Sequence, residues 1–184
     1  MWSLIIKHFD RYDLQWELEI SLAIAQLKEP EPIIKQLLKE DGSKKNQHIP
    51  YSFAAQAISC GTEVSVEARH QVIDRGFELV DTLPSVSADF SKITGGLIWV
   101  SLSHFPVDDY LKKKCRQLLA NEKSLPTARI GAAKLLEEYD TLAKFVREWR
   151  NTYLRRDALK VLQEAGNINH IKSTLQAPIL DLHF

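Results

Sequence analysis

Cysteine is scarce in this chain of 184 residues, and its placement excludes two kinds of framework. The two cysteines, Cys60 and Cys115, lie far apart and belong to no CxxC or Cys/His ligand pattern. Disulfide scaffolds and structural zinc sites need closely spaced sets of such residues. Both cysteines fall in apolar patterns with helical spacing, so we expect them to be small, buried hydrophobic side chains.

An excess of charge of either sign is also missing, since 24 lysines and arginines balance 24 aspartates and glutamates. No global field therefore attracts the molecule to nucleic acid or to an acidic membrane. No apolar run approaches the roughly 20 residues that a membrane span requires, and residues 1–8 lack the regions of a signal peptide. We expect a cytoplasmic protein that does not bind membranes.

No set of side chains forms a recognisable catalytic or cofactor motif. The six histidines are scattered, without the HxxH or HExxH spacing of a helical metal site. His104 follows two serines but has no acidic partner at an interpretable spacing, and Gly95-Gly96 lacks the lysine or hydroxyl residue of a phosphate loop. We therefore expect a protein that is not an enzyme, with no catalytic, cofactor-binding or metal-binding residues.

Apolar residues with helical spacing run through most of the chain, and proline and glycine mark the breaks. Residues 84–92 are expected to form a loop, and residues 97–102 fit a buried helix or a strand, with helix favoured by context. The pattern predicts an all-α protein with a single domain over residues 1–184. The expected helix starts are Asp13, Pro32, Pro50, Ser65 or Thr62, Pro106, Ser124 with Pro126, Asp140, about Arg155, and Asn167.

A short internal repeat is the most informative feature that is present. Residues 128–139 align without a gap on residues 154–165. A helical unit of this size cannot bury its own apolar face, so repeated units stack on one another. The repeat therefore predicts an α-solenoid. The alignment places Arg129 on Arg155, Ala132 on Ala158, Leu136 on Leu162, Leu142 on Ile168 and Phe145 on Ile171.

The repeated pattern Arg-x-x-Ala-x-x-x-Leu resembles that of HEAT-like repeats, particularly the short variety of phycobilisome-lyase-like proteins. The resemblance covers residues 124–177, and residues 69–76 follow the same frame less closely. It implies a short α-solenoid of HEAT-like helical hairpins, with an irregular antiparallel helical bundle as the alternative. It also implies a binding surface, because solenoids of this kind mostly act through an exposed concave face.

An arginine-rich segment with interleaved aromatic residues is the candidate partner-binding surface. Arginine and aromatic side chains supply planar anchors for protein interfaces and phosphate groups. Arg147 and Arg150 are expected on one helix face and Trp149 on another, where it could belong to the core. The alternative is an ordinary solvated face. The candidate residues are Arg147, Trp149, Arg150, Tyr153, Arg155 and Arg156.

Three functions remain open at this point. We favour a non-catalytic module that binds another protein, for example an immunity protein that occludes a cognate bacterial toxin. The second is a nucleic-acid-binding HEAT-like protein or a DNA-repair glycosylase, with Asp157, Trp149 and Arg150 around a damaged base. The third is a scaffold or adaptor that associates with itself through the apolar segments 2–6 and 179–184.

Overall fold

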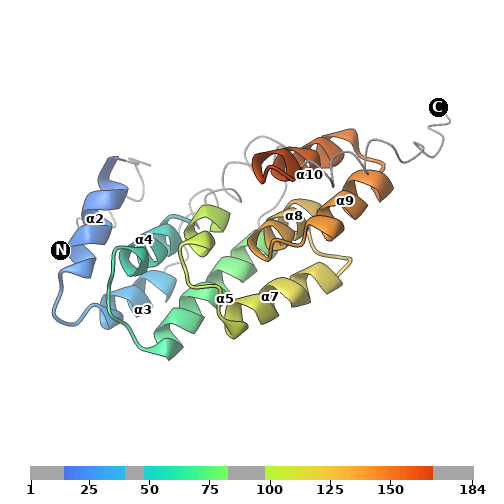
Figure 1. Ribbon diagram of the computed structural model, residues 1–184. Helices are drawn as coiled ribbons and strands as arrows, with labels where there is room; N and C mark the ends of the chain where they lie inside the picture. Colours follow the sequence, from blue (N-terminus) through green and yellow to red (C-terminus); the bar gives the residue numbers. More distant parts are fainter. Residues whose placement is uncertain (1–14, 40–47, 83–97, 168–184) are drawn as a thin grey trace. The chain divides into compact units, whose positions relative to one another are not determined.

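The computed structural model describes residues 15–39, 48–82 and 98–167, and these residues contain helices and no strand (Figure 1). The all-α prediction is therefore confirmed. The chain divides into two compact units, Met1–Pro106 and Val107–Phe184, and each unit is described by itself below. The solenoid arrangement and the single domain stay predictions.

The first unit is organised around one alanine-rich helix. It contains α2 (Gln15–Ala25), α3 (Glu31–Lys39), α4 (His48–Ser59) and α5 (Val66–Thr82), and α4 contacts each of the other three helices. Ala54, Ala55 and Ala57 of α4 are fully buried. Small side chains on several faces let neighbouring helices approach closely.

The contact between α4 and α5 depends on a glycine. A Cβ atom added at Gly76 of α5 would lie 2.7 Å from the hydroxyl oxygen and 3.0 Å from the Cζ atom of Tyr51. Tyr51 is 1% exposed, and its hydroxyl has no hydrogen-bond partner among the described residues. Burial raises the pKa of this phenol well above its usual range, so Tyr51 stays neutral in the folded protein.

Side-chain hydrogen bonds define the start of α5. The hydroxyl of Ser65 accepts a bond of 3.1 Å from the backbone amide of Ala68, which confirms Ser65 as the cap. Thr62, the alternative cap, instead donates to the carbonyl of Ala57.

The carboxylate of Glu31 on α3 has two partners. The amide of Ser65 donates to it at 3.1 Å, and Lys35 pairs with it at 2.6 Å. The pKa of Glu31 is lowered, first by Lys35 and then by Ser65.

Residues 98–103 form a helix, which resolves the helix-or-strand ambiguity for the described part of that run. Ile98 and Leu102 are fully buried, and the ring of Trp99 packs edge-on against Phe77 of α5, with centroids 5.7 Å apart. The expected loop at 84–92, the cap Asp13 and the helix after Asn167 lie outside the described residues.

The second unit contains α7 (Asp109–Ala120), α8 (Pro126–Leu135), α9 (Tyr139–Glu148) and α10 (Thr152–Glu164). Helix α8 contacts α7, α9 and α10, and α9 packs along α10 (Figure 1). The shared core combines apolar residues of three helices, with Leu142 of α9 fully buried among them. The other members of this core are Ile130, Ala133, Ala143, Phe145, Val146, Ala158 and Leu162.

The predicted starts of α7 and α10 are wrong by three residues, and α4 begins at His48, two residues before the predicted Pro50. Helix α7 begins after Asp108, whose carboxylate accepts from the amide of Leu111 at 2.9 Å, so Pro106 is not its first residue. Helix α10 begins at Thr152 rather than near Arg155. In α7 and α10 an Asp or Asn side chain bonds to the first-turn amides, and this cap sets the start.

Two predicted caps are also wrong. Pro126 is the first residue of α8, as expected, but the cap is Leu125, and the hydroxyl of Ser124 is buried without a partner among the described residues. Helix α9 is preceded by Glu138, so Asp140 lies inside its first turn. A carboxylate there still interacts favourably with the amino end of the helix dipole.

The internal repeat places equivalent helix positions on one another. The amide of Arg129 donates to the carbonyl of Leu125 at 3.0 Å, and the amide of Arg155 donates to the carbonyl of Asn151 at 3.1 Å. Each arginine is thus the fourth residue of its helix, α8 or α10. The alignment therefore follows helix register.

The apolar positions of the repeat agree in part. Ala132 and Ala158 are fully buried. Leu162 is also buried, whereas Leu136 is the C-cap of α8 and is partly exposed. The partners aligned with Leu142 and Phe145 lie outside the described residues.

The two cysteines differ in burial. Cys115 is fully buried in α7, and burial, with a smaller effect of the Glu138 carboxylate, raises the pKa of its thiol to about 12. Cys60, just beyond α4, is partly exposed. The expectation of a buried cysteine is therefore confirmed for Cys115 and wrong for Cys60.

We expect a disulfide reagent such as DTNB to modify Cys60 in the native protein at neutral pH and to reach Cys115 only after unfolding. The thiolate is the reactive form, and Cys115 is buried with a raised pKa, whereas Cys60 is partly exposed. Because the pKa of Cys115 is raised from the ordinary 9.0, its contribution to the free energy of unfolding is complete below pH 9.0 and is lost as the pH rises towards about 12. Fast modification of native Cys60→Ser protein would contradict this expectation.

Candidate functional site

The candidate arginine-aromatic segment spans the end of α9 and the start of α10. Helix α9 ends at Glu148, and Trp149 has extended backbone geometry with φ −74° and ψ 128°. Arg147 therefore lies in the last turn of α9, whereas Arg150 lies beyond the helix. The expectation that these two arginines share a helix face is wrong, because the helix ends between them.

Trp149 turns towards the core of the second unit. Its ring stacks on that of Phe145, with centroids 4.2 Å apart and planes 11° apart. Trp149 is partly buried and packs against the apolar core of α8, α9 and α10. One ring face of Trp149 is therefore covered within the protein.

Tyr153 and Arg156 form an exposed pair on α10. Tyr153 is 64% exposed, and the guanidinium carbon of Arg156 lies 5.5 Å from the centroid of its ring. The side chain of Asn151 accepts hydrogen bonds from the amides of Tyr153 and Leu154 at 2.9 and 3.3 Å, which holds this first turn in place. Arg155 is partly buried. We call Tyr153 and Arg156 the outer pair.

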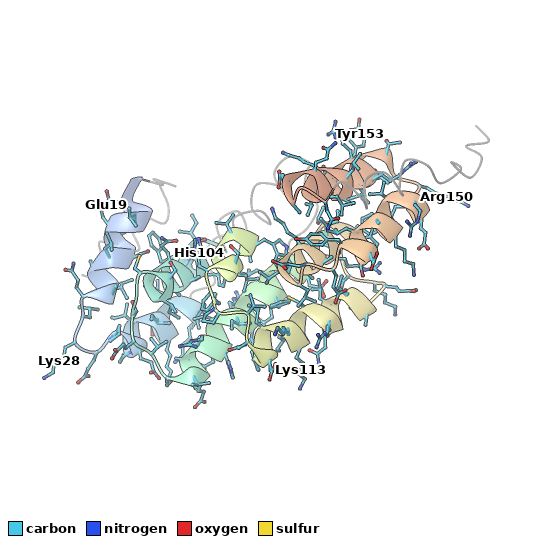
Figure 2. All side chains as sticks on the ribbon, in the orientation of Figure 1. Glu19, Lys28, His104, Lys113, Arg150 and Tyr153 are labelled. Atoms are coloured by element: carbon cyan, nitrogen blue, oxygen red, sulfur yellow. The ribbon has the colours of Figure 1, made fainter. Side chains whose placement is uncertain are left out.

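The structure does not gather all six candidate residues at one point. Figure 2 shows Tyr153 on α10 and Arg150 beyond the end of α9, apart from each other. Arg147, Arg150 and Arg156 are all exposed. The outer pair is thus accompanied by two further cations of the same segment, whereas Trp149 belongs to a different surface.

That surface is an open groove of about 600 Å³ within the second unit. Its walls come from α7, the turn after α7, α8 and α9. Leu119, Phe145 and Trp149 supply its apolar lining. Among the candidates from the sequence, Trp149 alone lines this groove.

Charged side chains of both signs also line the groove, and three of the six pair with a neighbouring side chain. Glu138 accepts a hydrogen bond of 3.1 Å from the hydroxyl of Thr141. Lys144 lies 3.9 Å from the carboxylate of Glu148. Arg116 and Glu122 line the groove and are exposed.

Arg129 differs from the other charged residues of the groove. Its guanidinium carbon lies 4.9 Å from the centroid of the Phe145 ring, a distance typical of cation–π contact. Its Nε atom is buried and has no hydrogen-bond partner among the described residues. No ion pair joins Arg129 to a carboxylate within the part of the chain that the structure describes.

Sequence reasoning treated Arg129 as a repeat position and not as a site residue. The spacing of Phe145 and Trp149, four residues apart in the sequence, was a usable signal, because such residues are neighbours on a helix surface. Arg116 lies in the basic run 112–116 of α7. No sequence signal connects these residues to Arg129, since three different elements carry them.

Residues 15–39, 48–82 and 98–167 contain no group of three or more His, Cys, Asp or Glu side chains that could hold a metal ion. Within the same ranges, every helix is too short or too polar to cross a bilayer.

Comparison with protein-family models, curated proteins and solved structures finds no match for the chain.

Proposed function

We propose that this protein is a non-catalytic module that binds another protein through the outer pair on α10. The observation that carries the proposal is the 64% exposure of Tyr153, whose ring is held beside Arg156. Tyrosine and arginine are enriched among the residues that dominate protein interfaces, because they combine a large contact area with directional polar groups. Covering such a ring removes apolar area from water and stabilises a complex.

The exposed arginines nearby support the same proposal. Arg147 and Arg150 lie in the same segment and face solvent. Cations at the edge of an interface speed the encounter with an acidic partner more than they increase affinity. An immunity protein that occludes an acidic surface of a toxin is a concrete form of this function, and the internal repeat of α8 and α10 fits HEAT-like hairpins as its framework.

Removing the outer pair is expected to weaken binding strongly. The partner is first captured from the native source and purified. Relative to the wild type, Tyr153→Ala should lower the affinity for this partner by about 30-fold, the loss typical of an interface hot spot, and Arg156→Ala by about tenfold. Titration calorimetry of each purified variant with the purified partner measures both losses. Val66→Ala, which truncates a side chain 62% exposed on α5, is the matched control and should bind as the wild type does.

Unchanged affinity in both α10 variants would overturn the assignment of the binding surface. A photo-reactive residue placed at position 153 gives a second readout, since it should crosslink to the partner, whereas the same residue at position 66 should not. A crosslink from position 66 alone would locate the interface in the first unit.

Nucleic-acid binding is the second candidate, favoured by the exposed arginines with a neighbouring exposed tyrosine. Bases stack on aromatic rings and phosphates pair with arginines. Fluorescence anisotropy of labelled duplex DNA and of single-stranded RNA tests it, because phosphate contacts weaken steeply as salt rises. Binding at low salt that disappears on Arg156→Ala would support this candidate, and no binding at low salt would exclude it.

A further inference from the structure

The groove of the second unit contains a cation whose charge the described residues do not neutralise. Arg129 is partly buried, contacts the face of an aromatic ring and has an orphaned Nε donor. A buried donor without an acceptor is costly, and a charged one more so. A guanidinium binds a carboxylate through two parallel hydrogen bonds. Arg129 is therefore suited to receive a carboxylate from outside the protein.

The apolar side chains beside Arg129 define the second part of the ligand. Leu119, Phe145 and Trp149 line the same groove, and the Phe145 ring that contacts Arg129 is also the ring on which Trp149 stacks. A volume of about 600 Å³ falls within the range of clefts that bind a ligand of drug size. A ligand must therefore present a carboxylate and an apolar side chain close together.

The carboxylates of the groove limit the charge of that ligand. Glu122, Glu138 and Glu148 line the groove together with Arg116, Arg129 and Lys144. A phosphate or a polyanion would meet these three carboxylates, and like charges brought together disfavour binding. A single carboxylate can pair with Arg129 at a smaller repulsive cost. The charge pattern favours a protein segment over a nucleic acid.

We propose that this groove binds a peptide segment in which an aspartate or glutamate lies beside a leucine or an aromatic residue. The carboxylate pairs with the guanidinium of Arg129, and the apolar side chain packs on Leu119 and Trp149, the partly exposed apolar residues of the groove. The site is separate from the outer pair, because neither Tyr153 nor Arg156 lines the groove. The proposal therefore goes beyond the proposed function and does not depend on it.

A random 12-residue peptide library displayed on phage tests the ligand chemistry even while the natural partner is unidentified. Selection on the wild-type protein, with counter-selection on Arg129→Met, should enrich sequences that place Asp or Glu within a few residues of Leu, Phe or Trp. Methionine keeps the apolar stem and removes the charge. Enriched sequences without an acidic position, or the same motif selected by both proteins, would overturn the proposal.

Synthetic peptides from the selection provide the quantitative arm. Replacing the peptide's Glu with Gln should weaken binding to the wild-type protein at least tenfold in fluorescence anisotropy, and this comparison requires no protein variant to fold. Arg129→Met should lose a similar factor, whereas Lys113→Ala on the exposed surface of α7 and Tyr153→Ala on α10 should lose none. A phosphorylated peptide that binds tighter than the Glu peptide would contradict the charge argument.

Discussion

Leu142→Ala is expected to lower the free energy of unfolding by about 2–5 kcal/mol, the usual cost of truncating a fully buried leucine. Leu142 is 0% exposed and lies in the core shared by α8, α9 and α10. Core residues of three helices surround it, so the site relaxes only in part and both the lost burial and the void contribute. Urea unfolding followed by far-UV circular dichroism measures the change.

The control for Leu142→Ala uses the same chemical change on an exposed leucine. Leu18 of α2 is 52% exposed, so Leu18→Ala should change the free energy of unfolding by no more than about 0.5 kcal/mol. Equal losses in the two variants would show that Leu142 is not the centre of a packed core.

Gly76→Ala is expected to destabilise the first unit by about 1–3 kcal/mol, the range for overpacking a filled core. A loss of stability would be informative, because replacing glycine by alanine inside a helix normally stabilises it by about 1 kcal/mol. Here the new methyl group would lie 2.7 Å from the hydroxyl oxygen of Tyr51. The buried ring of Tyr51 must move for the variant to fold.

A double-mutant cycle isolates this contact. Tyr51→Phe alone should be neutral or stabilising, since it removes a buried hydroxyl that has no hydrogen-bond partner among the described residues. Combined with Gly76→Ala it should restore part of the lost stability, because the nearest clashing atom is gone, while Cζ remains 3.0 Å away. Additive effects in thermal and urea unfolding would contradict direct contact between these two residues.

Periodicity predicted helices more reliably than it predicted helix ends. Pro126 and Ser65 were placed correctly, since proline and serine act within the local chain. Asp140 and Ser124 were both plausible caps, but neither side chain has that role in the structure. Several residues near each start are of a type that can cap a helix, and periodicity does not distinguish among them.

The candidate site shows the same limit. The contact of Tyr153 with Arg156 fits their spacing on one helix, three residues apart in the sequence. The exposure of Tyr153 depends instead on what packs against α10. The separation of Trp149 from that pair depends on where α9 ends, and the groove depends on three elements that converge. Neither the separation of Trp149 from the outer pair nor the groove can be predicted from one segment of the chain.

The sequence by itself determined the helical class, the start of α8 at Pro126 and the register of the repeated arginines, because each depends on residues within one or two turns of helix. Tertiary structure alone decided that Arg129 meets Phe145 and that Trp149 lines a groove. Side chains from separate helices come together only when their apolar faces pack, and that packing is set by the whole core.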